Sequence, residues 1–283
     1  MEVVSRTSSR WFHNQRLCDV PARLRAVFTS DHRDAVRRQL LGLAEKDPRI
    51  TGAAVTGSAA DGREDSWSDI DLFFGVAGRV ALDAVVADWR DYLYGQLGAL
   101  HHFDLKVPAG IYRAFLLPSC LEVDLGFTSA EQFGPVGPTF RAVFGEVAQA
   151  SPVPLPDPGH LIGLAWHHVL HARTCIERHK PWQAEHWISG IRDQTLALAC
   201  LRLGEPAHYA KGADALPAAV RGGLEDALVR SLELEELRRA LRVAATRLLL
   251  ELSATDAIQA RRLEQPIREL ADLAEGQPWD DPR

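Results

Sequence analysis

The chain has 283 residues, of which 46% are hydrophobic and 25% are charged, a composition typical of a globular protein long enough for two domains. Its formal net charge of −6 argues against nucleic acid as a partner, because binding a polyphosphate normally requires a basic face. The same charge favours a cationic small molecule.

The pattern of the first half of the chain predicts a mixed β-sheet with helices packed on it. Residues 1–30 form an N-terminal arm without clear periodicity, and the first domain is expected over residues 31–150. Breakers at 108–110 and 118–119 suit tight connections between antiparallel strands. In chain order the predicted elements are a helix at 31–46, a buried strand at 50–56, a short helix from about Ala59, a strand ending at Val76, a helix at 82–97 and extended runs at 102–107, 111–117 and 121–127.

Prolines alternate with other residues between 151 and 159, which predicts an extended linker that joins neither a helix nor a central strand. After this linker the spacing of apolar residues becomes helical, and residues 160–283 are expected to form a helical bundle. The predicted fold class is therefore α+β, with a sheet domain followed by a helical domain. The predicted helices cover residues 160–179, 182–203, 214–229, 231–252 and 256–275.

Acidic residues in two predicted strands point to a metal site. Asp69 and Asp71 at positions i and i+2 of a strand share a face about 6–7 Å apart, so they can hold divalent cations jointly. Asp124, on a neighbouring strand, would complete a cage of three carboxylates, which repel one another unless a cation lies between them. Glu122 shares the face of Asp124, so either residue can be the third ligand, and we favour Asp124.

A glycine turn precedes the acidic strand. The buried strand at 50–56 is followed by Gly57 and Ser58, where backbone N–H groups can surround a phosphate at a distance that only glycine permits. Ser68, which opens the acidic motif, stands ten residues after Ser58. Magnesium held by carboxylates usually also binds phosphate, so the two motifs together predict a nucleotide and metal site.

The joint pattern of the Gly-Ser turn, the Ser-Asp-Ile-Asp-Leu motif and the later acidic strand resembles the DNA polymerase β-type nucleotidyltransferase superfamily, in its small-molecule branch. The resemblance is specific over about residues 53–127 and loose elsewhere. It implies a nucleotidyltransferase that uses two Mg²⁺ ions and ATP as co-substrate. The residues that the resemblance assigns are Gly57, Ser58 and Ser68 for the nucleotide and Asp69, Asp71 and Asp124 for the metals.

Two predicted helices of the second domain carry polar stripes on one face. These stripes either satisfy each other inside the bundle or line a cleft opposite the carboxylates. The resemblance favours the cleft, since family members bind their substrates between the two domains. The stripes consist of Glu185, Ser189, Arg192 and Asp193 on one helix and of His167, His171, Thr174 and Arg178 on the helix before it.

Several residues of the helical half are candidates for binding. Arg192 is the predicted phosphate clamp, because a guanidinium makes two parallel bonds to phosphate oxygens, and Lys211 is either a second phosphate ligand or an ordinary surface charge. Glu185 is a candidate for an acceptor amine or for proton transfer, with Asp193 and His171 beside it in the predicted substrate group.

Two further aromatic features have competing interpretations. His167 and His171 can share a zinc ion at their i, i+4 spacing, but a packing or cleft role is favoured because no other ligand stands at a suitable distance along the chain. Trp67, beside the aspartates, is expected either to stack on a base or sugar or simply to pack.

The expected reaction is attack by a hydroxyl of a small acceptor on the α-phosphate of ATP, with release of pyrophosphate. Glu122 is the first candidate for the general base and Glu185 the second. The two-domain plan resembles aminoglycoside and lincosamide nucleotidyltransferases, so a cationic or hydroxyl-rich antibiotic is the expected acceptor. Transfer of AMP to a protein, as in toxin–antitoxin systems, and a non-catalytic nucleotide sensor are the alternatives.

The four cysteines, Cys18, Cys120, Cys175 and Cys200, are scattered and are expected to be reduced core residues. Residues 1–24 contain no continuous apolar run, so no secretory signal is expected, and no segment has the length to span a bilayer. These features predict a cytoplasmic protein without a membrane partner.

Overall fold

The computed structural model describes residues 28–107, 110–137, 139–149 and 154–273. The chain divides into two compact units, Met1–Val153 and Pro154–Arg283, and each is described by itself. The boundary between them falls within the segment expected to be the linker. Most of the N-terminal arm lies outside the described residues.

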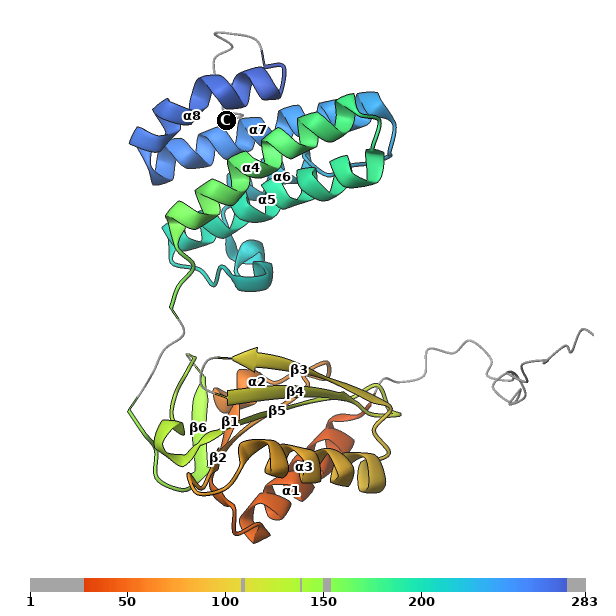
Figure 1. Ribbon diagram of the computed structural model, residues 1–283, viewed down its shortest axis with the longest axis vertical. Helices are drawn as coiled ribbons and strands as arrows, with labels where there is room; N and C mark the ends of the chain where they lie inside the picture. The colour runs from red at the N-terminus through yellow and green to blue at the C-terminus, as the bar shows by residue number, and fades with distance from the viewer. Residues whose placement is uncertain (1–27, 108–109, 138, 150–153, 274–283) are drawn as a thin grey trace, which may run out of the picture. The chain divides into compact units, whose positions relative to one another are not determined.

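The first unit is built on a six-stranded mixed sheet in the order β3-β4-β5-β2-β1-β6 (Figure 1). Strands β2 and β5 pair in parallel at its centre, and the other neighbouring strands pair antiparallel. The mixed sheet with flanking helices is therefore as predicted. The strands are β1 (Ile50–Thr56), β2 (Ile70–Val76), β3 (His101–Val107), β4 (Gly110–Leu116), β5 (Glu122–Ser129) and β6 (Phe140–Phe144).

The two long helices of this unit, α1 (Ser30–Lys46) and α3 (Leu82–Leu97), lie on the same side of the sheet (Figure 1). Both helices were predicted, and their ends agree with the predicted ends to within one residue. Helix α1 begins after Thr29, whose side-chain oxygen accepts a hydrogen bond from the His32 N–H at 3.2 Å. Helix α3 ends at Gly98, whose φ of +66° closes the last turn in the left-handed region.

Alternation along β2 and β5 separates the two faces of the sheet. In β2, Ile70, Leu72 and Phe74 belong to the core beneath α1 and α3, and in β5 the residues Val123 and Leu125 do the same. Successive side chains of a strand point to opposite faces, so the residues between them face away from the helices. The acidic residues of both strands occupy those positions.

Strand β6 is the element that the sequence pattern did not predict. It has only five residues, three of its side chains are exposed, and it pairs with β1 at the edge of the sheet. A short edge strand needs no continuous apolar face, so periodicity gives little signal there.

The second unit is a helical bundle, as predicted, with a main apolar core and a smaller apolar cluster that contains Cys200 and Leu216. Most helix boundaries shift from the prediction by one to five residues, and two of the shifts have a clear physical cause. Helix α4 starts at Pro158, inside the expected linker, because proline fits the first helical turn and the Asp157 side chain accepts bonds from two following N–H groups. The helices are α4 (Pro158–Glu177), α5 (Pro181–Leu203), α6 (Ala218–Glu225), α7 (Leu234–Thr255) and α8 (Ala257–Leu270).

The second difference concerns the helix expected over residues 214–229. A 3₁₀ turn at Ala213–Ala215 is separated from α6 by Leu216, whose backbone is extended, and by Pro217. Because proline restricts the residue before it to extended conformations, one continuous helix cannot form across this point.

Cysteine burial corrects part of the sequence-based expectation. Cys175 and Cys200 are buried, but Cys120 is exposed in the turn between β4 and β5, where its φ is +61°. Cys18 lies outside the described residues. No helix in the described part of the chain combines the length and the apolar character needed to cross a lipid bilayer.

Candidate active site

Three carboxylates meet at the beginning of strands β2 and β5. Asp69 immediately precedes β2, Asp71 is its second residue, and Asp124 is the third residue of β5. Each offers one oxygen, and these oxygens lie within 4.8 Å of one another. Among the described residues this is the only group of three or more His, Cys, Asp or Glu side chains close enough to share an ion.

The parallel pairing of β2 with β5 explains this convergence. In its register Asp71 is the partner of Asp124, and neighbouring strands are only about 4.8 Å apart. Both residues lie between core-facing neighbours, so both carboxylates point to the face opposite the helices. The structure therefore brings together the three acids that the sequence singled out.

The electrostatics of the group indicate that it is incomplete without a cation. Burial, and then the charges of Glu122, Asp71 and Asp69, raise the pKa of Asp124 to about 7. Its Oδ1 atom is buried and has no hydrogen-bond partner among the described residues. Three half-buried oxygens around one point, with one oxygen unsatisfied, fit a hard divalent cation such as Mg²⁺.

Asp124, and not Glu122, belongs to the close group of carboxylates. Glu122 is exposed and does not belong to the close group of three, although its charge acts on Asp124. This arrangement leaves Glu122 beside the cluster and accessible to solvent, as a proton acceptor would need to be.

Gly57 brings the backbone of the preceding turn against the acidic cluster. Its φ is +62°, and a Cβ atom built at this position would stand 1.9 Å from Oδ2 of Asp71. No side chain larger than hydrogen fits there without displacing the carboxylate. Helix α2 (Gly57–Ala60) starts at this residue rather than at Ala59, and Ser58 is half-buried within it.

Ser68 does not point freely toward the cluster. Its hydroxyl donates to Oδ1 of Asp65 at 3.1 Å and accepts the backbone N–H of Asp65 at 3.0 Å. The side chain thus closes the turn that leads into Asp69. Trp67 in the same turn is 74% exposed, and its suggested stacking role stays a prediction.

Tyr112 is a neighbour of the cluster that sequence reasoning missed. Burial, together with the charges of Asp71 and Asp124, raises the pKa of Tyr112 to about 12, so its phenol stays protonated. The ring stacks on Phe73 at 5.8 Å between centroids. Its strand β4 could be predicted, but its position beside Asp124 follows from the register of β4 with β5, which periodicity does not encode.

The residues predicted in the second domain lie in the second unit, and their meeting with the acidic cluster stays a prediction. Glu185 accepts a hydrogen bond from the Ser189 hydroxyl at 2.7 Å, so part of this polar stripe is satisfied within its own helix. Asp193 is paired with Arg192 at 3.0 Å. Lys211 is exposed, as expected for a surface charge.

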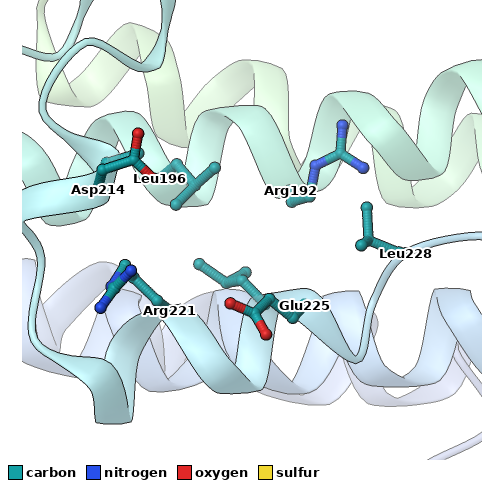
Figure 2. Close-up of a pocket in the computed structure, with 8 residues that line it drawn as sticks. Arg192, Leu196, Asp214, Arg221, Glu225 and Leu228 are labelled. Atoms are coloured by element: carbon teal, nitrogen blue, oxygen red, sulfur yellow. The ribbon is translucent and has the colours of Figure 1, made fainter.

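Arg192 lines a pocket of about 160 Å³ within the second unit (Figure 2). Arg192 and Leu196 come from α5, and Arg221 and Glu225 come from α6. The pocket is therefore lined by two guanidinium groups and also by the carboxylates of Asp214 and Glu225. The Arg221 Nε atom already donates to the Leu216 carbonyl at 3.0 Å. The positive charges of this pocket are therefore partly compensated by its own residues.

The histidine stripe packs around one tryptophan. His171 stacks on Trp187 at 5.0 Å between ring centroids, His168 lies at 5.1 Å, and His167 contacts His171 at 4.2 Å. No third His, Cys, Asp or Glu ligand joins these rings among the described residues. The ring contacts agree with the packing interpretation of His167 and His171, and the zinc interpretation stays a hypothesis.

Replacing Asp124 by asparagine is expected to stabilise the metal-free protein at pH 8. The native pKa is about 7, above the ordinary value of 3.8, so the folded state binds this proton more tightly than the unfolded state. Stability contributed by the proton is present below about pH 4 and is lost as pH rises through about 7. With chelator present, the melting temperature of the variant at pH 8 should exceed that of the wild type by about 3 °C or more.

The same pair of proteins provides the control for this prediction. At pH 5 the two melting temperatures should be nearly equal, since Asp124 is then largely protonated, and all histidines are common to both proteins. Added Mg²⁺ should stabilise only the wild type at pH 8. An identical pH dependence of the melting temperature in the two proteins would contradict the raised pKa of Asp124.

No protein-family model matches the chain, and no curated protein matches its sequence. Among solved structures, an aminoglycoside 6-adenyltransferase from Bacillus subtilis has 10% sequence identity and a TM-score of 0.38, covering 82% of this chain and 95% of that one. A nucleotidyltransferase-like protein from Exiguobacterium sibiricum has 11% identity and a TM-score of 0.32, covering 83% and 80%. Because both TM-scores are below 0.5, the chemistry of the site rests on this chain's own residues.

Proposed function

We propose that the protein is a Mg²⁺-dependent nucleotidyltransferase that transfers AMP from ATP to a hydroxyl group of a small molecule. The observation that carries the proposal is the convergence of three carboxylates around a glycine turn whose backbone abuts one of them. Phosphate and divalent cation are the ligands that such a combination suits. The sequence resemblance points to the same chemistry.

In the proposed site Asp69, Asp71 and Asp124 hold the magnesium ions, and the turn at Gly57 and Ser58 receives the phosphates. Bound magnesium supplies charge neutralisation for the triphosphate and lowers the pKa of the attacking hydroxyl. The protonated Tyr112 offers a neutral donor beside the acids rather than a fourth negative charge.

The proton of the acceptor hydroxyl needs a base near the cluster. Glu122 is our first choice, because it is exposed and close enough for its charge to act on Asp124. Glu185 is the second choice, although its carboxylate is already bonded to Ser189. Arg192 and Lys211 are proposed to bind phosphate, and Asp193 and His171 to contact the acceptor.

For the acceptor we propose an aminoglycoside or lincosamide type of antibiotic, on the basis of the sequence resemblance and the negative net charge. The test is incubation of the full chain with ATP, Mg²⁺ and a panel of such compounds, followed by mass analysis for an added AMP. The expected result is adenylation of one class of compound with release of one pyrophosphate per product.

Asp69→Ala serves as the negative control in this panel. It is expected to give no product above background, because it removes one of the three carboxylates that are proposed to bind magnesium. Near-normal turnover by Asp69→Ala would reject the assigned site. Labelling of protein instead of any antibiotic would replace the small-molecule acceptor by a protein side chain. ATP binding without transfer to any acceptor would indicate a nucleotide sensor.

A further inference from the structure

We infer that Arg33 is a positioning residue of the acidic site, whose guanidinium fixes the loop before Asp69 and thereby sets the affinity of the site for metal. The inference rests on the proposed function, since it concerns the ligand role of Asp69. Arg33 belongs to α1, on the helix-covered side of the sheet, and nothing in its sequence surroundings marks it as functional.

The contacts of Arg33 converge on one short loop. Its Nη1 atom donates to the Asp65 carbonyl at 2.5 Å and to the Ser68 carbonyl at 3.1 Å, and its Nε atom lies 3.2 Å from Oε1 of Glu64. The Ser68 carbonyl is part of the peptide group that contains the Asp69 nitrogen. Holding that carbonyl therefore fixes the peptide plane from which the Asp69 side chain extends.

The loop is also closed internally. Oδ1 of Asp65 accepts the Trp67 N–H at 2.8 Å and the Ser68 hydroxyl at 3.1 Å. Its other end is held by Arg37, one turn after Arg33 on α1, whose Nη1 donates to Oε2 of Glu64 at 3.1 Å. Residues 64–68 are thus tied to one face of α1 by hydrogen bonds at both ends of the segment.

The burial of Arg33 argues that these contacts are specific. The residue is only 4% exposed, and a guanidinium is removed from water at a net cost unless its partners compensate for the lost hydration. An apolar side chain of similar volume would fill the space without a buried charge but would leave the Asp65 and Ser68 carbonyls without this donor. A lysine keeps the charge but lacks the planar fork that reaches several acceptors at once.

The test is the affinity of the full-length protein for Mn²⁺, measured by electron paramagnetic resonance without nucleotide. Arg33→Lys is expected to weaken Mn²⁺ binding by about 10-fold or more, as the loss of outer-shell support does at other metal sites. Hydrogen exchange should rise in residues 61–72 of the variant and stay unchanged in β4 and α3. A wild-type affinity in a folded Arg33→Lys protein would overturn the inference.

Arg37→Lys is the matched control, because it alters the Glu64 contact and leaves both carbonyl bonds of Arg33 in place. Its Mn²⁺ affinity should stay within about 2-fold of the wild-type value, a much smaller change than the loss of affinity expected for Arg33→Lys. An equal loss in Arg37→Lys and Arg33→Lys would show general loosening of α1 and would overturn the specific role.

Two further variants keep the outcome decisive. If Arg33→Lys does not fold, Arg33→Met fills a similar space without a buried charge and removes both carbonyl bonds, and a wild-type Mn²⁺ affinity in Arg33→Met would overturn the inference. Asp69→Ala separates this inference from the proposed function. Loss of Mn²⁺ binding in Asp69→Ala but not in Arg33→Lys rejects the inference alone, whereas wild-type binding in Asp69→Ala rejects the metal site itself.

Discussion

Replacing Asp71 by asparagine is expected to lower the rate of nucleotidyl transfer by a factor of about 10³ or more, equivalent to about 4 kcal/mol of transition-state stabilisation. Asp71 occupies the centre of the site. It is the strand-register partner of Asp124, and its carboxylate lies so close to Gly57 that a Cβ atom at position 57 would collide with it. Asparagine keeps the shape of the side chain and removes the negative charge, so the loss reports metal binding rather than packing.

The measurement is single-turnover transfer at saturating ATP over a range of Mg²⁺ concentrations. Part of the loss should reappear as a higher Mg²⁺ requirement, since a neutral amide is a weaker ligand than a carboxylate. In the absence of metal the variant should be at least as stable as the wild type, because one of the charges that repel Asp124 is gone.

Asp91→Asn is the matched control for Asp71→Asn. Asp91 lies on α3, on the helix-covered side of the sheet, and its carboxylate is exposed beside Arg90. The control removes the same charge from the same unit and should change the transfer rate less than 2-fold, as is usual for an exposed ion pair. An Asp71→Asn protein that retained a tenth of the wild-type rate would contradict a central metal-binding role.

Local pattern was enough to predict most of the sheet and the pairing of Asp69 with Asp71. Alternation of apolar residues predicted β2 and β5, and the i, i+2 spacing predicted that Asp69 and Asp71 act together. What joined Asp124 to them was the resemblance and the expectation of neighbouring strands. The parallel register that pairs Asp71 with Asp124 is a long-range property that no window of the sequence contains.

The residues that the sequence did not indicate share this long-range origin. Arg33 resembles any charged residue near the start of an amphipathic helix, and only the folded structure shows it buried against a loop 32 residues further along the chain. Tyr112 resembles an ordinary strand residue until β4 pairs with β5. Both become informative only through a contact made in the fold.

Gly57→Ala is expected to impair the site more than any other single-methyl change in the first unit. The added Cβ would stand 1.9 Å from Oδ2 of Asp71, closer than non-bonded atoms ever approach, so the turn and the carboxylate must separate. The φ of +62° adds backbone strain of about 1 kcal/mol for a residue with a side chain. Transfer should fall by about 100-fold, as a misplacement of about 1 Å at a reacting centre implies.

Gly62→Ala is the control for Gly57→Ala, because it introduces the backbone strain without the collision. Gly62 has a similar φ of +75°, but a Cβ built there meets nothing within 4 Å. Gly62→Ala should lose about 1 kcal/mol of stability in urea unfolding and Gly57→Ala at least as much, whereas only Gly57→Ala should also lose transfer activity and Mg²⁺-dependent stabilisation. Equal activities in the two alanine variants would contradict this prediction. They would mean that transfer tolerates a displacement of the Asp71 carboxylate away from the turn that is proposed to hold the phosphates.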